Sequence, residues 1–128
     1  MIYLDSSVAL AHLLAEEQRL PDVPWNEPLT SSRLLEYEVW NRLHAKGFGT
    51  ALADTARTYL DSIDFVRLTP EVLARALDPF PMNVRTLDGL HLATMEYLRG
   101  EGASIELATF DSRMIVAARA LGIAIYTR

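Results

Sequence analysis

Segments with a strand pattern and segments with a helix pattern alternate along the whole chain, and this alternation restricts the possible folds more than any other feature. We expect strands near residues 4, 30, 66, 107 and 124, with helical segments between them. Strands that alternate with helices form right-handed crossovers and a mostly parallel sheet that is covered on both faces. The predicted fold is therefore α/β, a three-layer α/β/α arrangement around a mostly parallel sheet of about five strands.

Length and composition fit one domain. The 128 residues, 50% of them hydrophobic, are enough to fill a single core, so we expect one domain over residues 1–128. The sequence has no cysteine, which excludes disulfides, thiolate zinc sites and cysteine nucleophiles. The longest apolar run, residues 8–14, is too short to span a membrane, and no basic segment of a signal peptide begins the sequence. We therefore expect a cytoplasmic protein without membrane contact.

The first predicted strand ends at a carboxylate. Residues 2–4 are apolar and favour a strand, Asp5 follows them, and Ser6 and Ser7, which suit a helix start, come next. In open α/β sheets ligands bind at the carboxyl edge of the strands, so Asp5 is a site candidate. Helix capping is the alternative role, and position alone does not separate the two. Asp111 also follows a predicted strand and precedes a helix, which predicts the same edge for it.

Further carboxylates come from helical segments. Asp88 lies early in the helical residues 85–99, on a face with apolar residues, and a carboxylate buried there needs a partner, which a metal ion would supply. Glu36 and Glu38 lie in a second helical segment. Apolar residues surround that segment, so periodicity does not choose between the two glutamates. A solvated surface position is the alternative for both.

Other polar side chains near these carboxylates have two possible roles each. His91, three residues after Asp88, is either a ligand or base, or a hydrogen-bonded core histidine. Thr109 either offers its hydroxyl to a metal-bound water or a phosphate, or is a β-branched strand residue. Arg85 and Arg113 either hold a phosphate or pair with a neighbouring carboxylate. In each case we favour the structural role.

Four short motifs follow one another along the chain. They are Tyr3-Leu4-Asp5-Ser6-Ser7, Leu35-Glu36-Tyr37-Glu38-Val39, Leu87-Asp88-Gly89-Leu90-His91-Leu92-Ala93-Thr94 and Thr109-Phe110-Asp111-Ser112-Arg113. Together they resemble the successive motifs of the PIN domain family, most closely those of VapC-type toxins. The resemblance runs from the first strand to the last. It implies a metal-dependent endoribonuclease with an acidic quartet, the toxin of a type II toxin–antitoxin pair that a small VapB antitoxin usually holds inactive.

By this resemblance four carboxylates are both catalytic residues and metal ligands. They are Asp5, Glu38, Asp88 and Asp111. The expected ion is Mg²⁺, which Mn²⁺ can replace, because both prefer oxygen ligands. Asp5 and Asp111 are the expected primary ligands, and the other two act directly or through water. The implied reaction is hydrolysis of an RNA phosphodiester by water that the ion activates, without a covalent intermediate, and the number of ions stays open.

Charge and apolar surface indicate partners. The net charge is −5 and no basic footprint is present, so RNA recognition should depend on the metal ions and a few local contacts. Single-stranded or looped RNA suits such contacts better than a duplex. Besides a VapB-type antitoxin we expect a homodimer, because residues 8–14, Trp25 and Trp40 offer more apolar surface than one core requires.

Two other interpretations fit parts of the pattern. A phosphoacceptor receiver domain also has acidic strand ends, but it needs adjacent acidic residues after the first strand and a late lysine. Here Ser6 and Ser7 follow Asp5, and Lys46 is the only lysine. The second alternative is a non-catalytic PIN-like module that docks protein or RNA. A cleavage assay with titrated metal separates this module from a nuclease.

Overall fold

Strands and helices alternate as predicted in the computed structural model, which describes residues 1–14 and 27–127. Within these residues the strands are β1 Ile2–Leu4, β2 Leu29–Ser32, β3 Asp64–Val66, β4 Glu106–Ala108 and β5 Ala124–Ile125. The helices in the same residues are α1 Ser6–Leu13, α2 Leu34–Ala45, α3 Ala53–Asp61, α4 Pro70–Leu77, α5 Thr86–Gly100 and α6 Ser112–Ala120. Each predicted strand position therefore falls in or directly beside a strand.

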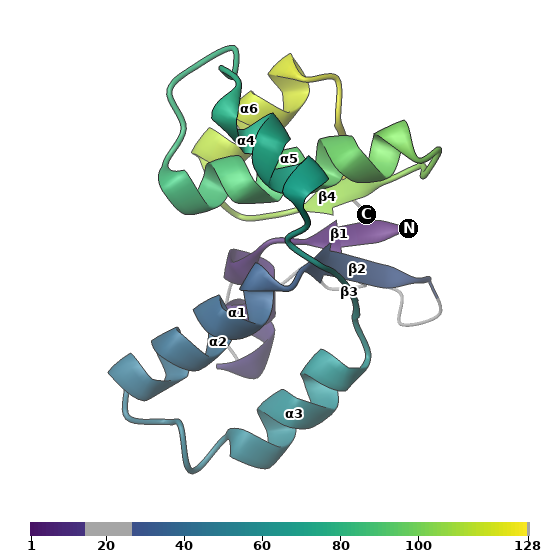
Figure 1. Cartoon of the computed structure of the whole chain (residues 1–128). Coiled ribbons are helices and arrows are strands. Elements are labelled where there is room, and N and C mark those ends of the chain that lie inside the picture. Colours follow the sequence, from purple (N-terminus) through teal and green to yellow (C-terminus); the bar gives the residue numbers. More distant parts are fainter. Residues whose placement is uncertain (15–26, 128) are drawn as a thin grey trace.

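The strands of the described residues form one parallel sheet in the order β3-β2-β1-β4-β5 (Figure 1). The central strand is β1, in which Ile2 pairs with Leu29 on one side and with Glu106 on the other. Since neighbouring strands run in the same direction, the residues that follow β1 and β4 emerge at the same edge of the sheet. This topology places the segments after Leu4 and Ala108 side by side.

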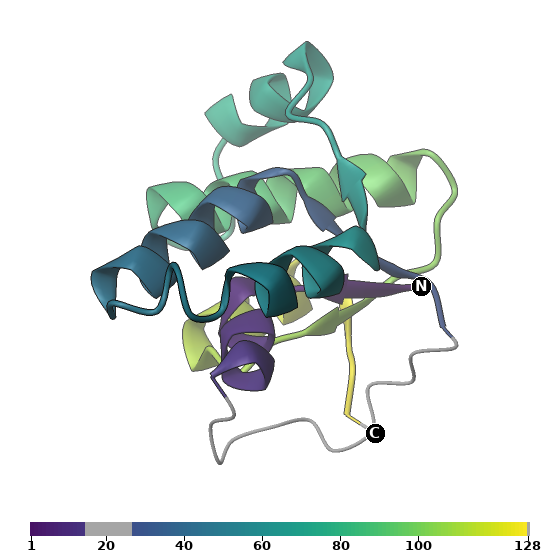
Figure 2. The ribbon, with the colours of Figure 1, turned by 90° about the horizontal axis from the view of Figure 1, so that it is seen from below.

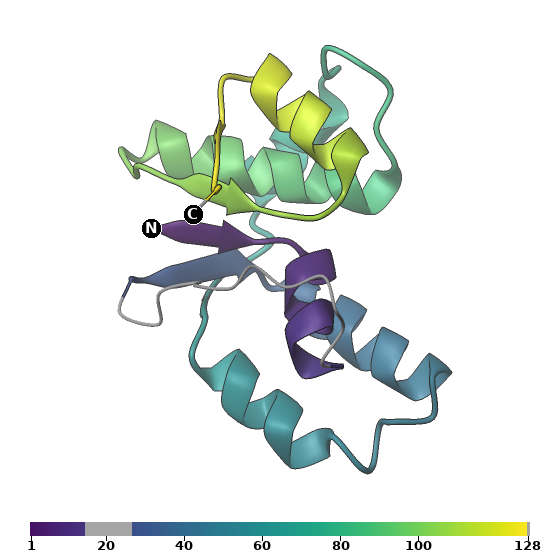
Figure 3. The ribbon, with the colours of Figure 1, turned by 180° about the vertical axis from the view of Figure 1, so that it is seen from behind.

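Helices cover both faces of the sheet. Helices α1, α2 and α3 lie on one face, which is turned toward the viewer in Figure 2, and α5 and α6 lie on the other, with α4 packed on α5 (Figures 1 and 3). Side chains of β1 alternate between two cores: Ile2 and Leu4 pack under α1 to α3, and Tyr3 packs under α5 and α6. The three-layer α/β/α prediction is confirmed.

Local sequence explains where several helices begin and end. Thr69 caps α4, because its Oγ1 accepts a hydrogen bond of 3.3 Å from the Val72 N–H, and Pro70 takes the favoured first position. Gly122 follows α6 with φ at 75°, a left-handed conformation that favours glycine. No helix of the described ranges is long and apolar enough to cross a bilayer.

The apolar residues 8–14 are mostly used inside this chain. Val8, Ala9, Ala11 and Leu13 are buried. Trp40 is partly buried and packs against the same core, and Trp25 lies outside the described residues. The expectation that residues 8–14 form an apolar surface is therefore wrong, since helices α2 and α3 cover them. The homodimer itself stays a prediction.

Replacing Leu107 by Ala should lower the free energy of unfolding by about 2–5 kcal/mol, because the substitution leaves a cavity in a core that cannot fully collapse. Leu107 in β4 is 0% exposed, whereas Leu77 in α4 is 87% exposed. The matched control Leu77→Ala should therefore change the unfolding free energy by less than about 0.5 kcal/mol. Urea titration of both variants measures the difference. Similar losses in the two variants would contradict this placement of Leu107.

Candidate active site

A cleft of about 560 Å³ opens where the chain leaves β1 and β4. Its lining includes the four carboxylates predicted from the sequence, Asp5, Glu38, Asp88 and Asp111. Asp5 directly follows β1, Asp111 precedes α6, and the other two side chains come from α2 and α5. The structure thus brings together carboxylates from four separate parts of the chain.

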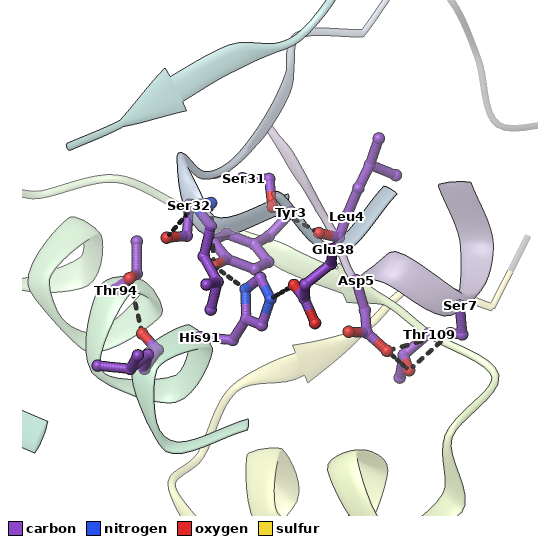
Figure 4. A network of polar contacts seen from close by, with 12 residues as sticks. Tyr3, Leu4, Asp5, Ser7, Ser31, Ser32, Glu38, His91, Thr94 and Thr109 are labelled. Atoms are coloured by element: carbon purple, nitrogen blue, oxygen red, sulfur yellow. Dashed lines mark hydrogen bonds and ion pairs between the residues drawn. The ribbon is translucent and has the colours of Figure 1, made fainter. Parts of the chain in front are cut away.

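Hydroxyl groups hold Asp5, which is only 5% exposed. Asp5 occupies the position before α1, but its carboxylate accepts no capping bond from that helix. Instead its Oδ2 accepts hydrogen bonds from Thr109 Oγ1 at 2.6 Å and from Ser7 Oγ at 3.0 Å (Figure 4). The capping alternative is therefore not the role that the structure gives to this side chain. Its other oxygen lies on the side of Glu38 in Figure 4.

A buried chain of hydrogen bonds holds Glu38. His91, which is 0% exposed, has its Nε2 at 2.5 Å from Glu38 Oε1 and its Nδ1 at 2.7 Å from Tyr3 Oη. The Ser32 N–H donates to the same Tyr3 oxygen at 3.1 Å. Burial raises the pKa of the Tyr3 hydroxyl, which stays protonated. A carboxylate oxygen accepts, so His91 Nε2 donates to Glu38, and every group in this chain has a partner.

The same contacts distinguish the two glutamates of α2. Glu36 forms an ion pair with Arg33 at 2.6 Å, and the two side chains are 36% and 55% exposed. The Glu38 side chain is 14% exposed and lines the cleft. Glu38 rather than Glu36 therefore faces the other carboxylates, a choice that helical periodicity left open. His91 takes the favoured role of a hydrogen-bonded core histidine.

Negative charge is concentrated around Asp88. Burial raises the pKa of this half-buried carboxyl, and the charges of Asp5 and Asp111 raise it further, while His91 and Arg85 act in the opposite direction. The carboxylates are thus close enough to repel one another. Asp111 has a second role at the start of α6, because its Oδ1 accepts a hydrogen bond of 2.9 Å from a backbone N–H two residues later.

Two arginines lie near these carboxylates. Arg85 lines the cleft, and both Arg85 and Arg113 are exposed. Within residues 1–14 and 27–127 neither guanidinium forms an ion pair of 4 Å or less, although the charge of Arg85 lowers the pKa of Asp88, so the favoured pairing is not a direct contact. Both cations are therefore positioned to meet a ligand from solvent.

The donor set of the cleft fits a divalent cation that keeps part of its water. Carboxylate oxygens are the ligands that Mg²⁺ and Mn²⁺ prefer, and a nearby cation would offset the repulsion that raises the pKa of Asp88. Among the described residues, no three His, Cys, Asp or Glu side chains already converge on one point as a complete chelate. Mg²⁺ usually takes only one or two carboxylates and fills its other positions with water and phosphate oxygens. Such partial coordination is what this cleft offers.

The comparison with known proteins agrees with this geometry. The model of the PIN domain family matches residues 2–120. The chain belongs to the PIN domain family. Ribonuclease VapC46 of Mycobacterium tuberculosis strain H37Rv is 38% identical over 128 residues, which cover 97% of this chain and 95% of that relative. Ribonuclease VapC47 of Mycobacterium tuberculosis strain CDC 1551 is 28% identical over 129 residues, with 95% and 93% covered.

A solved structure shares the fold of this PIN domain. It is described as a toxin-antitoxin complex from Klebsiella pneumoniae and aligns with a TM-score of 0.67 over 99% of this chain and 97% of that chain. The sequence identity is 14%, so this likeness concerns the fold alone.

Two supporting side chains of this PIN domain were not predicted from the sequence. Ser7 was interpreted only as a helix start, although its hydroxyl donates to Asp5. Tyr3 was interpreted only as a strand residue, although its hydroxyl contacts His91. A tyrosine in a buried strand needs a partner for its hydroxyl, and this requirement was the available signal.

Replacing Asp88 by Asn should raise the melting temperature at neutral pH when divalent ions are absent. The folded-state pKa of Asp88 lies above its ordinary value of 3.8, so the ionised form costs stability at any pH above the raised pKa. Below the pKa of the unfolded chain both states are protonated and the cost disappears. The gain of the variant should therefore grow as pH rises through this interval and then level off.

Thermal unfolding in EDTA at several pH values measures this gain. Glu101→Gln, which changes an exposed carboxylate outside the cleft, is the matched control and should show a smaller effect. A gain for Asp88→Asn that is the same at acidic and neutral pH would contradict the proposed repulsion.

Proposed function

We propose that this PIN domain is a metal-dependent endoribonuclease that hydrolyses RNA phosphodiesters through its acidic quartet, as the toxin of a type II toxin–antitoxin pair. The observation that carries the proposal is the gathering of four carboxylates in one cleft; they are Asp5, Glu38, Asp88 and Asp111. Two relatives that align over nearly the whole chain are named as ribonucleases, which supports the proposed activity.

In this proposal the residues of the cleft hold the ion and the substrate. Asp5 and Asp111 are the primary ligands of Mg²⁺ or Mn²⁺, and Glu38 and Asp88 act directly or through water. When bound, such an ion supplies Lewis-acid activation of water and stabilises charge on the phosphate. Thr109 fixes one oxygen of Asp5, so the carboxylate keeps one orientation in the cleft. This arrangement needs no covalent intermediate.

The hydrogen bonds that fix His91 also position Glu38. Glutamate has three side-chain torsions, and holding it in one rotamer costs conformational entropy. The His91 Nε2–H bond of 2.5 Å favours one position of the Glu38 carboxylate before any ligand binds. A preorganised ligand set of this kind loses less free energy to reorganisation during the reaction.

Partners form the second part of the proposal. A neighbour in fold is described as part of a toxin-antitoxin complex, and this supports a VapB-type antitoxin as the protein that binds this chain. RNA is the proposed substrate, and single-stranded or looped segments are the preferred form because an acidic chain with net charge −5 offers few cations for a long duplex. A homodimer stays a prediction that light scattering tests.

Cleavage of mixed RNAs in Mg²⁺, Mn²⁺ or EDTA tests the proposed activity. We expect cleavage with either ion and none in EDTA. Asp5→Asn should lower the rate by about 10²–10³-fold, the usual cost of removing one preorganised electrostatic group, while circular dichroism shows a retained fold. No cleavage by the wild-type protein with either ion, together with metal-independent RNA or protein binding, would indicate a non-catalytic docking module.

Glu38→Gln should lose far more activity than Glu36→Gln. Glu38 lines the cleft beside the other carboxylates, whereas Glu36 pairs with Arg33 at the surface. The two substitutions make the same chemical change two residues apart in α2, so each is the matched control of the other. Initial cleavage rates at saturating metal measure the ranking, and the reverse order would transfer the role to Glu36.

A further inference from the structure

A second cavity adjoins the carboxylate cleft. It has a volume of about 510 Å³ and lies between the segment that precedes α5 and helix α6. Apolar side chains form half of its lining and include Met82, Val84, Met114 and Val116, and polar side chains form the rest. Cavities of this size and apolar character are typical of sites that enclose a small flat ligand group.

The cavity and the cleft share part of their lining. Arg85 and Asp88 line both of them, so the cavity lies directly beside the carboxylates. Arg113 also lines the cavity. Two guanidinium groups without an ion pair among the described residues therefore line this cavity, which favours a ligand that carries negative charge beside an apolar group.

A nucleotide has this combination of groups. Its phosphate is anionic, and its base is flat with apolar faces once it leaves the stack of a helix. We propose that the cavity, which we call the base pocket (Met82, Val84, Met114 and Val116), receives the unstacked base next to the scissile phosphate. This inference rests on the proposed ribonuclease function. Arg85 and Arg113 then hold the phosphates on either side of that base.

The composition of the base pocket also indicates how selective it is. Met82 and Met114 have flexible, polarizable side chains that adapt to different shapes. Asn83 and Ser112 also line the cavity and can hydrogen-bond to a base edge. The pocket therefore requires a base that can leave its stack, which confines cleavage to unpaired positions.

An abasic scan tests this inference without any substitution in the protein. A single-stranded RNA with one site that the wild-type protein cuts is synthesised with an abasic nucleotide at each position around that site. We expect kcat/KM to fall about 10-fold when the abasic nucleotide directly flanks the cut on one side, and to change little at distant positions. Equal effects at all positions would show that no base pocket is used.

Filling the pocket provides the second arm of the experiment. Val116 is 55% exposed, so Val116→Trp adds bulk at the pocket without disturbing the core. We expect this variant to lose about 10-fold in kcat/KM on intact RNA and to lose nothing more on the abasic substrate. Ala120→Trp, an exposed position one turn along α6 that does not line the pocket, is the matched control and should behave as wild type.

The outcomes separate this inference from the function on which it rests. If the wild-type protein cuts no RNA with Mg²⁺ or Mn²⁺, the proposed function is wrong. If it cuts RNA but the abasic scan shows no dependence beside the cut, or Val116→Trp cleaves as wild type, the base pocket is wrong and the nuclease stands. Unchanged cleavage by Val116→Trp together with weakened binding of a protein partner would assign the cavity to protein docking instead.

Discussion

Repulsion among carboxylates that share one end of a sheet is the constraint to which the rest of this structure adapts. The pKa of Asp88 reflects it: burial raises this pKa most, and the charges of Asp5 and Asp111 raise it further. Hydrogen bonds hold two of these carboxylates in place: Thr109 donates to Asp5, and His91 donates to Glu38. The described residues therefore keep a concentration of negative charge that costs stability in the absence of a cation. A divalent ion would relieve that cost, so ion binding and folding stability are linked.

The core and the candidate site share residues, so core packing helps to position the side chains of the cleft. Tyr3 lies in the central strand and packs in the core under α5 and α6, yet its hydroxyl lies at one end of the hydrogen-bond chain to Glu38. Ser32, at the end of β2, donates to the same hydroxyl. The pairing of β1 with β2 thus helps to set the position of a side chain on α2. Packing changes near His91 should consequently alter the cleft even though that imidazole is fully buried.

The sequence predicts a site residue well when its immediate neighbours in the chain decide its position, and poorly when a distant contact decides it. Asp5 and Asp111 were predicted because each lies between a strand and a helix, and parallel strands bring such positions to one edge. The choice of Glu38 over Glu36 rested on family resemblance alone, because apolar residues surround α2 and the contact that selects Glu38 comes from His91, 53 residues away in the chain. The apolar residues 8–14 misled the interpretation for a related reason: composition does not show which neighbours cover a segment.

The strand order has a consequence for how the protein is made. Strand β1 pairs with β2 on one side and with β4 on the other, so its two neighbours leave the ribosome at very different times. Thr109 and Asp111 follow β4, whereas Asp5 and Glu38 belong to the first third of the chain. A nascent chain that lacks β4 therefore has three of the four carboxylates, since Asp111 follows β4, and it has an unpaired edge on β1. Such a chain has no complete site, and the proposed nuclease would become competent only after β4 and the segment that carries Asp111 have been made.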